Sequence, residues 1–299
     1  MGVVRCGTTP FGRATRDEPL RRTVSTGSDV LTNRTLVMSG GSRGIGLAIA
    51  LAAARHGANL VLLAKTSEPH PKLPGTVHTA VAEIEAVGGK AAAVVGDVRK
   101  EEDVERAVGT AVERFGGVDI VVNNASAIAT EPTEALSAKK FDLMMDINVR
   151  GTFLLTKAAL PHLRTSQHAH VLTLSPPMNM NPYWLGVHPA YTLSKYGMTL
   201  LSLGWATEYA EAGIAVNCLW PHTYINTAAV ANMAEGNHIA SSSRSPEIMA
   251  DAAVEILSRP AAEASGNCYI DADVLTGSGV DDLSRYGGGE HPTLDLFLD

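Results

Sequence analysis

The stretch that decides the fold is Ser39-Gly40-Gly41-Ser42-Arg43-Gly44-Ile45-Gly46, which joins a short apolar run to a helical pattern. Gly40 permits a tight turn, Gly44 lets the backbone approach a pyrophosphate, and Gly46 lets the helix pack closely on the strand. The N-terminus of that helix offers free N–H groups and a positive dipole end to phosphate groups. Glycine loops are common, but this strand–loop–helix placement predicts a dinucleotide site.

Short apolar strands and helices alternate along most of the chain. Strands are predicted at 36–38, 59–64, 91–95, 120–122, 171–174, 214–219 and 268–270, and helices at 45–56, 77–87, 101–115, 137–162, 191–212 and 246–258. Fully apolar strands separated by helices are typical of a parallel sheet covered on both faces. We therefore expect an α/β fold, with one doubly wound domain over residues 34–276 and a seven-stranded parallel sheet flanked by helices.

The composition excludes several classes of protein. The 299 residues carry 24 Lys and Arg against 31 Asp and Glu, and this net charge of −7 argues against a nucleic-acid-binding surface. No run of about 18 apolar residues occurs, so we expect no membrane span. Cys6, Cys218 and Cys268 are too widely spaced for a disulfide framework or a cysteine-based zinc site. We predict reduced cysteines, no metal site and a cytoplasmic location.

The two ends of the chain differ from the central domain. Residues 1–33 contain five Arg with many Thr and Gly and no apolar period, so we expect a flexible extension, with a targeting peptide as the alternative. Residues 277–299 form a Gly-rich tail that ends in Leu296-Phe297-Leu298 and Asp299. The sequence leaves two alternatives for this tail: it docks on a neighbouring subunit, or it forms a solvated coil.

The spacing Gly-x3-Gly-x-Gly resembles the short-chain dehydrogenase/reductase family, in which a Thr precedes the first Gly and Ser39 keeps its hydroxyl here. The resemblance covers roughly residues 35–273 and implies a Rossmann-type domain. Asn123-Asn124-Ala125-Ser126, Ser175-Pro176-Pro177 and Trp220-Pro221 are similar to the hydroxysteroid-dehydrogenase-like subgroup. Members of the family usually form homodimers or homotetramers, which implies pairing through the helices at 137–162 and 191–212.

The end of the second strand indicates which nicotinamide cofactor binds. Ala64 stands where the family's NAD enzymes carry an Asp, and an acid there would repel a ribose 2′-phosphate, whereas Lys65 and Arg43 attract one. We therefore expect NADP(H). The resemblance implies a cofactor-binding set of Ser39, Gly40, Ser42, Arg43, Gly44, Ile45, Gly46, Lys65, Asp97, Val98, Asn123, Ala125, Tyr191, Lys195, Ile225 and Thr227.

The stretch Tyr191-Thr192-Leu193-Ser194-Lys195 matches the family's Tyr-x3-Lys motif. Residues i and i+4 share one face of a helix, so Lys195 lies beside Tyr191. An ammonium at that position favours the phenolate and lowers the tyrosine pKa, which makes Tyr191 a general acid or base. The resemblance adds Asn148, which in the family helps to hold a proton-relay water.

The fourth catalytic position is open. Pro176 stands where the family has its serine, and Ser175 lies one residue earlier. Two consecutive prolines force a different turn here, so we expect Ser175 to polarise the substrate carbonyl. Asn179 and Asn181 are the alternative donors.

Together these features predict an NADP(H)-dependent oxidoreductase. The resemblance implies that it transfers hydride between the nicotinamide and a carbonyl or alcohol of a mostly apolar small molecule of lipid, steroid or terpenoid type. The alternative is a catalytically lapsed NADP(H)-binding sensor or scaffold, which the displaced serine and His222 in place of a family Gly support. The family places its mobile substrate lid at residues corresponding to 226–245.

Overall fold

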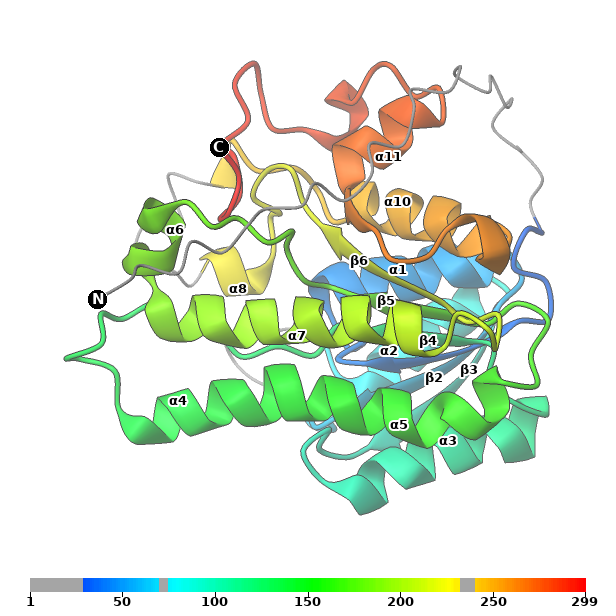
Figure 1. Cartoon of the computed structure of the whole chain (residues 1–299). Coiled ribbons are helices and arrows are strands. Elements are labelled where there is room, and N and C mark those ends of the chain that lie inside the picture. Colours follow the sequence, from blue (N-terminus) through cyan, green and yellow to red (C-terminus); the bar gives the residue numbers. More distant parts are fainter. Residues whose placement is uncertain (1–28, 70–74, 232–239) are drawn as a thin grey trace.

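A computed structural model describes residues 29–69, 75–231 and 240–299 and shows one seven-stranded parallel sheet (Figure 1). The strand order is β3-β2-β1-β4-β5-β6-β7. The strands are β1 (Thr35–Ser39), β2 (Asn59–Ala64), β3 (Lys90–Val95), β4 (Ile120–Asn123), β5 (His170–Thr173), β6 (Ala215–Trp220) and β7 (Cys268–Ile270). The chain runs from β1 outward to β3 and then returns to β4 on the other side of β1, so the predicted doubly wound sheet is confirmed. Ligands of such sheets bind at this reversal, outside the carboxyl ends of the strands.

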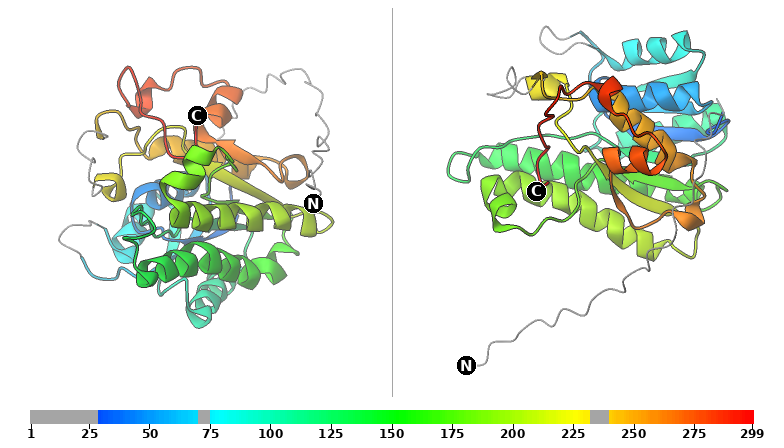
Figure 2. Two further views of the ribbon diagram at one scale, coloured as in Figure 1. Left: turned by 60° about the vertical axis from the view of Figure 1, so that its left-hand side comes forward. Right: turned by 90° about the horizontal axis from the view of Figure 1, so that it is seen from above.

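Helices cover both faces of the sheet (Figures 1 and 2). One face carries α1 (Gly44–Arg55), α2 (Val77–Ala86), α10 (Glu247–Ser258) and α11 (Asp271–Gly277), and the other carries α3 (Glu101–Phe115), α5 (Gly151–Leu163) and α7 (Pro189–Glu208). Each face therefore has an apolar core of its own, built from side chains that alternate along the strands. Short helices α6 (Pro182–Val187) and α8 (Ala228–Ala231) lie near the carboxyl ends of the strands.

The register brings the site-bearing loops together. Ser39 at the end of β1 pairs with Leu63 of β2 on one side and with Asn123 of β4 on the other. Because all these strands are parallel, the loops that follow them open at one edge of the sheet. The glycine loop therefore lies between the loops after β2 and β4.

The long helix predicted over 137–162 is interrupted at its centre. It consists of α4 (Ala138–Met144), a π-helical turn (Met145–Arg150) and α5. The buried Asn148 lies within this π-helical turn, which is wider than an α-helical turn. Such turns occur frequently at functional sites, and this one lies against α7.

Both ends of the described chain pack on the domain. Residues 29–33 were assigned to the extension, but the Leu31 side chain is fully buried and its N–H donates to the His56 carbonyl, so the domain begins before residue 34. Residues 1–28 lie outside the described part. The C-terminal tail is not a solvated coil, because residues 294–299 fold back beside α6 and α7, where Phe297 is buried (Figures 1 and 2). None of the described helices is both long and apolar enough to cross a lipid bilayer.

Candidate active site

Two adjoining cavities open at the carboxyl ends of the strands. The larger, of about 530 Å³, lies over the ends of β1 to β4, and the smaller, of about 200 Å³, lies beside α7. The two share the side chains of Ile45, Asn124, Ser126 and Thr227, so they are parts of one continuous site. We call them the cofactor cleft and the inner pocket.

The glycine loop forms the floor of the cofactor cleft. Gly40 has a φ of +76°, and a Cβ there would lie 2.9 Å from the Ala125 Cα. Asn124 holds the loop from the other side, because its Nδ2 donates to the carbonyl oxygens of Gly40 at 2.9 Å and Ser39 at 3.2 Å. No described side chain caps the N-terminus of α1 at Arg43, so its first N–H groups face the cleft uncapped. This arrangement fits the pyrophosphate of a dinucleotide.

Two residues of the predicted cofactor-binding set are structural instead. The Ser39 Oγ accepts from the backbone N–H groups of Asn124 and Ala125 at 3.3 and 3.1 Å. The Asn123 Nδ2 donates to the hydroxyls of Thr156 and Thr173, inside the protein. Neither Ser39 nor Asn123 is part of the described cleft lining. Their side chains hold the strand ends in position and lie outside the cleft lining.

The remaining glycine-loop and strand-end residues of the set line the two cavities. The cleft wall includes Gly40, Ser42, Arg43, Gly44, Ile45, Gly46, Lys65, Asp97, Val98, Ala125 and Thr227. Ile225 lines the inner pocket together with Tyr191 and Lys195. In the described residues, no group of three or more His, Cys, Asp or Glu side chains gathers that could hold a metal ion.

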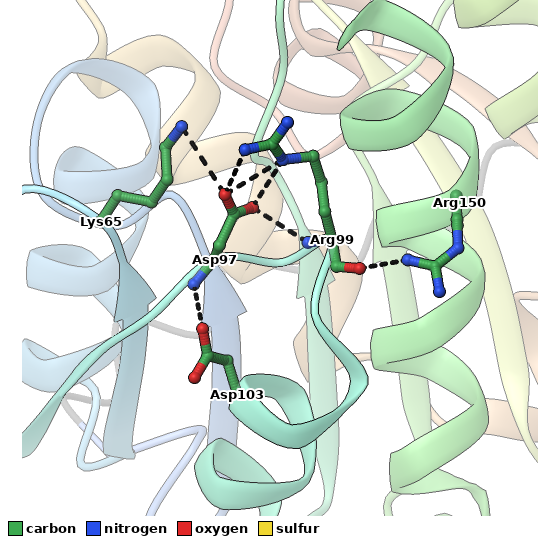
Figure 3. Close-up of polar contacts among 5 residues, drawn as sticks. All are labelled: Lys65, Asp97, Arg99, Asp103 and Arg150. Atoms are coloured by element: carbon green, nitrogen blue, oxygen red, sulfur yellow. Dashed lines mark hydrogen bonds and ion pairs between the residues drawn. The ribbon is translucent and has the colours of Figure 1, made fainter. Parts of the chain in front are cut away.

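A cluster of charged side chains lies where the loops after β2 and β3 border the cleft (Figure 3). Arg99 binds the Asp97 carboxylate through Nε and through Nη2, the latter at 2.6 Å, and the Lys65 Nζ lies 3.8 Å from the same group. The hydrogen bond from Arg99 lowers the pKa of Asp97, and burial opposes this. Arg150 in turn donates to the Arg99 carbonyl. The sequence analysis missed Arg99, whose only signal is its place two residues after Asp97.

Arg43 reaches across the same end of the cleft. Its Nη2 donates to the Thr66 Oγ1 at 3.0 Å and the Gly75 carbonyl at 3.2 Å. Its Nη1 is buried and has no hydrogen-bond partner among the described residues. A buried guanidinium nitrogen with a free donor is suited to an anionic ligand group.

Tyr191 and Lys195 lie one turn apart on α7 and line the inner pocket. The Lys195 Nζ donates to the Leu174 carbonyl at 2.7 Å and lies 5.1 Å from the centre of the Trp220 ring. Burial lowers the pKa of Lys195 to about 8. Burial also raises the pKa of Tyr191, and Asp295 and Tyr224 add to the effect, whereas the sequence analysis expected Lys195 to lower it. Loss of hydration therefore disfavours the Tyr191 phenolate in this pocket.

Asn148 holds the loop after β4 against α7. Its Oδ1 accepts from the Ala127 N–H at 2.8 Å, and its Nδ2 donates to the Ala127 carbonyl and the Ser194 Oγ, both at 2.9 Å. The Ser194 hydroxyl donates in turn to the Tyr191 carbonyl at 2.8 Å. Asn148 therefore positions the helix turn that carries Tyr191.

The structure does not bring Ser175 to the inner pocket. The hydroxyl is fully buried beside the Cys218 thiol, and Leu174 lines the pocket instead. The reason is a tight turn, in which the Ser175 N–H donates to the Thr173 carbonyl at 2.9 Å before the two prolines. The alternative donors are also engaged elsewhere, because Asn179 and Asn181 bind the C-terminal residues.

Several pocket residues were missed by the sequence analysis. Tyr224 follows β6, and Asp295 and Leu296 come from the C-terminal tail. The only sequence signal for the tail was an apolar Leu-Phe-Leu run with a preceding Asp. Of the expected lid over 226–245, residues 232–239 lie outside the described part, and Thr227 and Val230 line the inner pocket.

Comparison with known proteins identifies the family to which this chain belongs. The model of the short chain dehydrogenase family matches residues 34–238. Hydroxysteroid dehydrogenase-like protein 2 of Xenopus tropicalis is 53 % identical over 271 residues, which cover 90 % of this chain and 64 % of the relative. The chain thus spans less than two thirds of that relative's length.

Solved structures agree with the family match. A short chain dehydrogenase from Mycobacterium thermoresistibile is 49 % identical, with a TM-score of 0.85, and the match covers 90 % of this chain and 96 % of the other. L-sorbose reductase from Gluconobacter frateurii, solved with NADPH and L-sorbose, is 26 % identical with a TM-score of 0.71, over 81 % of this chain and 96 % of the other. The chain belongs to the short-chain dehydrogenase/reductase family of oxidoreductases, among the relatives of hydroxysteroid dehydrogenase-like protein 2.

Proposed function

We propose that this chain is an NADP(H)-dependent oxidoreductase that interconverts a carbonyl and an alcohol in a mostly apolar small molecule. The observation that carries the proposal is that Tyr191 and Lys195 line an inner pocket continuous with the cofactor cleft. A hydroxyl that holds its proton at the wall of such a pocket suits a general acid in carbonyl reduction.

Some residues of the chain would hold the cofactor, and others would transfer the proton or keep the proton donor in position. The glycine loop and the N-terminus of α1 would hold the pyrophosphate, and Thr227 lies where the cleft meets the inner pocket. When bound, the nicotinamide supplies or accepts the hydride. Tyr191 gives its hydroxyl proton to the carbonyl oxygen as the alcohol forms, and Lys195 stabilises the phenolate that remains. Asn148 keeps the Tyr191 turn in place through Ser194.

The charge pattern at the adenosine end supports NADP(H) over NAD(H). Arg43 has a buried nitrogen with no described partner, and Lys65 and Thr66 line the same part of the cleft. Ala64 also lines it, at the place where an acid would select the ribose 2′-hydroxyl. The nearby Asp97 carboxylate is matched by Arg99 and Lys65, so its charge is compensated. L-sorbose reductase, a structural neighbour, was solved with NADPH.

The lining of the inner pocket supports an apolar substrate. More than half of its lining residues are apolar, and they include Ile128, Trp220, Val230, Met249 and Leu296. Small-molecule sites of this kind use apolar walls for affinity and a few polar groups for orientation. We propose a lipid, steroid or terpenoid carbonyl as the substrate class; of these, the steroid is the class that the name of the Xenopus tropicalis relative mentions.

Exposed apolar side chains on two helices support a homo-oligomer. Phe153 on α5 is 42 % exposed, and Leu193 and Leu200 on α7 are 53 % and 58 % exposed. Apolar side chains of this size on neighbouring helices are typical of a subunit interface. We propose that two copies of the chain pair through α5 and α7.

Substitution of the proposed acid tests the function. Tyr191→Phe removes only the hydroxyl, so we expect carbonyl reduction to fall by about 10²- to 10⁴-fold. NADPH affinity, measured by calorimetry, should remain that of the wild type. Activity of Tyr191→Phe at the wild-type rate would refute the mechanism. The family match and the relatives give no support to a lapsed sensor or scaffold.

A further inference from the structure

The last residues of the chain form part of the inner pocket. Asp295 and Leu296 line it together with Tyr191 and Lys195, and Phe297 is buried directly behind them. These residues lie more than a hundred positions after Tyr191 in the sequence. Figures 1 and 2 show the C-terminal segment descending beside α6 and the first turns of α7.

Hydrogen bonds hold this segment to the loops that follow β5 and β6. The Asp295 N–H donates to the His222 carbonyl at 3.1 Å, and the Trp220 Nε1 donates to the Leu296 carbonyl at 3.0 Å. The Asn179 Nδ2 donates to the Phe297 carbonyl at 3.0 Å. The backbone of the segment is therefore fixed at successive residues, and the direction of the Asp295 side chain is fixed with it.

Aromatic packing adds to this anchoring. The Phe297 ring lies 6.2 Å from the Tyr191 ring in a stacked arrangement, and 5.3 Å and 5.9 Å from the rings of Tyr196 and Trp220. Aromatic pairs at such distances contribute beyond the area they bury. Phe297 thus supports the ring of the proposed acid, and the segment is a built part of the site.

The inner pocket also lacks its expected serine. Ser175 is buried beside Cys218, and the apolar Leu174 takes its place in the wall. A carbonyl oxygen that receives a proton from Tyr191 would be polarised by a second hydrogen-bond donor on the same side. The Asp295 carboxyl group, which lies in the pocket wall near Tyr191 and Lys195, is the candidate for this second donor.

We propose that Asp295 is a catalytic residue that donates a hydrogen bond from its carboxylic acid to the substrate carbonyl oxygen, in the role Ser175 leaves vacant. This rests on the proposed function. During reduction, hydride adds to the carbonyl carbon, the carbon–oxygen π electrons pass to oxygen, and the oxygen takes the Tyr191 proton. Asp295 keeps its own proton and stabilises the negative charge as it develops.

Burial and the nearby Asp271 carboxyl on α11 favour the neutral form of Asp295. Burial raises the pKa of Asp295 to about 7 and Asp271 adds to this, whereas the Leu296 N–H, which donates to the Asp295 Oδ1 at 2.6 Å, and Lys195 oppose it. The Leu296 bond occupies Oδ1 and leaves Oδ2 to carry the proton. Tyr191 and Tyr224 are the other titratable groups that face the same space. A carboxyl with a pKa near neutrality is protonated below that pH and can donate, as in other enzymes that keep an acid neutral in an apolar site.

The test compares Asp295→Asn and Asp295→Ala, with Asp281→Asn on the exposed part of the tail as the matched control. The assay is NADPH-dependent reduction of a carbonyl that the wild-type protein turns over, measured on both sides of pH 7. Wild-type kcat should fall as pH rises through about 7, because the ionised carboxylate cannot donate. Asp295→Asn should remove that fall and keep most of the activity, since the amide donates at every pH.

Asp295→Ala should lose about 10²-fold or more in kcat at acid pH, the cost of one donor to a developing oxyanion. NADPH affinity by calorimetry and the activity of Asp281→Asn should stay at wild-type values. Wild-type kcat in Asp295→Ala, or an unchanged pH profile in Asp295→Asn, would overturn the inference. If Tyr191→Phe is inactive in the same assay, only the role of Asp295 fails; if Tyr191→Phe is active, the proposed function fails as well.

Discussion

Substitution of Gly46 by Ala tests how the glycine loop is built. A Cβ on Gly46 would lie 2.5 Å from the Asn124 Nδ2 and 2.6 Å from the Gly40 carbonyl oxygen, well inside the 3.4 Å at which ordinary contact begins. These two atoms are hydrogen-bonded to each other at 2.9 Å. The new methyl group therefore has to separate them, and the loop shifts away from α1.

The magnitude follows from the contacts that are lost. Overpacking of this kind costs about 1–3 kcal/mol, and the broken hydrogen bond adds about 1 kcal/mol. The helix preference of Ala over Gly returns up to about 1 kcal/mol, which leaves a net destabilisation of about 2 kcal/mol. For a domain of this size that lowers Tm by roughly 4–8 °C. Since the Gly40 carbonyl moves, NADPH binding should also weaken, by at least about tenfold.

The assay is thermal unfolding and NADPH calorimetry on Gly46→Ala and on a matched control, Gly109→Ala. Gly109 lies inside α3, and none of the described heavy atoms comes within 4 Å of a Cβ added there. The control should gain about 0.5–1 kcal/mol in the free energy of unfolding and bind NADPH like the wild type. A Gly46→Ala variant with wild-type Tm and wild-type NADPH affinity would refute the reasoning.

Further predictions concern the cleft, the π-helical turn and the pH dependence of stability. Lys65→Ala should weaken NADPH by about tenfold and leave NADH little changed, because it removes one charged contact to the 2′-phosphate; calorimetry with both cofactors checks this. Asn148→Ala should lower the free energy of unfolding by about 2–4 kcal/mol in urea, since it strands buried groups of Ala127 and Ser194. Burial lowers the pKa of His170 to about 4, below that of an unfolded histidine. The resulting stability, up to about 3 kcal/mol, is present above about pH 6.5 and is lost as pH falls through 4. His170→Gln should flatten the dependence of Tm on pH in that window, and an unchanged dependence would contradict the assignment.

Much of the fold could be predicted because each strand is a continuous apolar run between glycine or polar turns. All seven strands were located to within one or two residues, and the glycine loop lies between β1 and α1 as expected. The π-helical turn at Asn148 was not predicted, because no residue pattern in this stretch separates an i→i+5 turn from the α-helix on either side of it.

The positions of candidate site residues along helices and at strand ends could be predicted from the sequence. The directions of their side chains could not. Tyr191 and Lys195 share a helix face by their spacing, so both reach the inner pocket. Ser39 and Asn123 lie at the predicted strand ends, but tertiary hydrogen bonds turn their side chains away from the cleft. Ser175 is withdrawn by a turn that two prolines follow.

The C-terminal contribution could not be predicted for a different reason. Asp295 and Phe297 reach Tyr191 only through contacts between segments far apart in the sequence. A tail without helical or strand periodicity gives no local signal of where it packs. Arg99 was missed for another reason, because its bond to Asp97 two residues earlier depends on the conformation of the turn between them.

The measurement that tests the central claim most directly is a calorimetric titration of the wild-type protein with NADPH and, in parallel, with NADH. If the cleft above α1 holds NADP(H) as proposed, NADPH will bind with the lower Kd. A lower Kd for NADH would contradict the assignment of Arg43 and Lys65 to a 2′-phosphate. Binding of neither cofactor would contradict the account of the cleft and of the oxidoreductase function built on it.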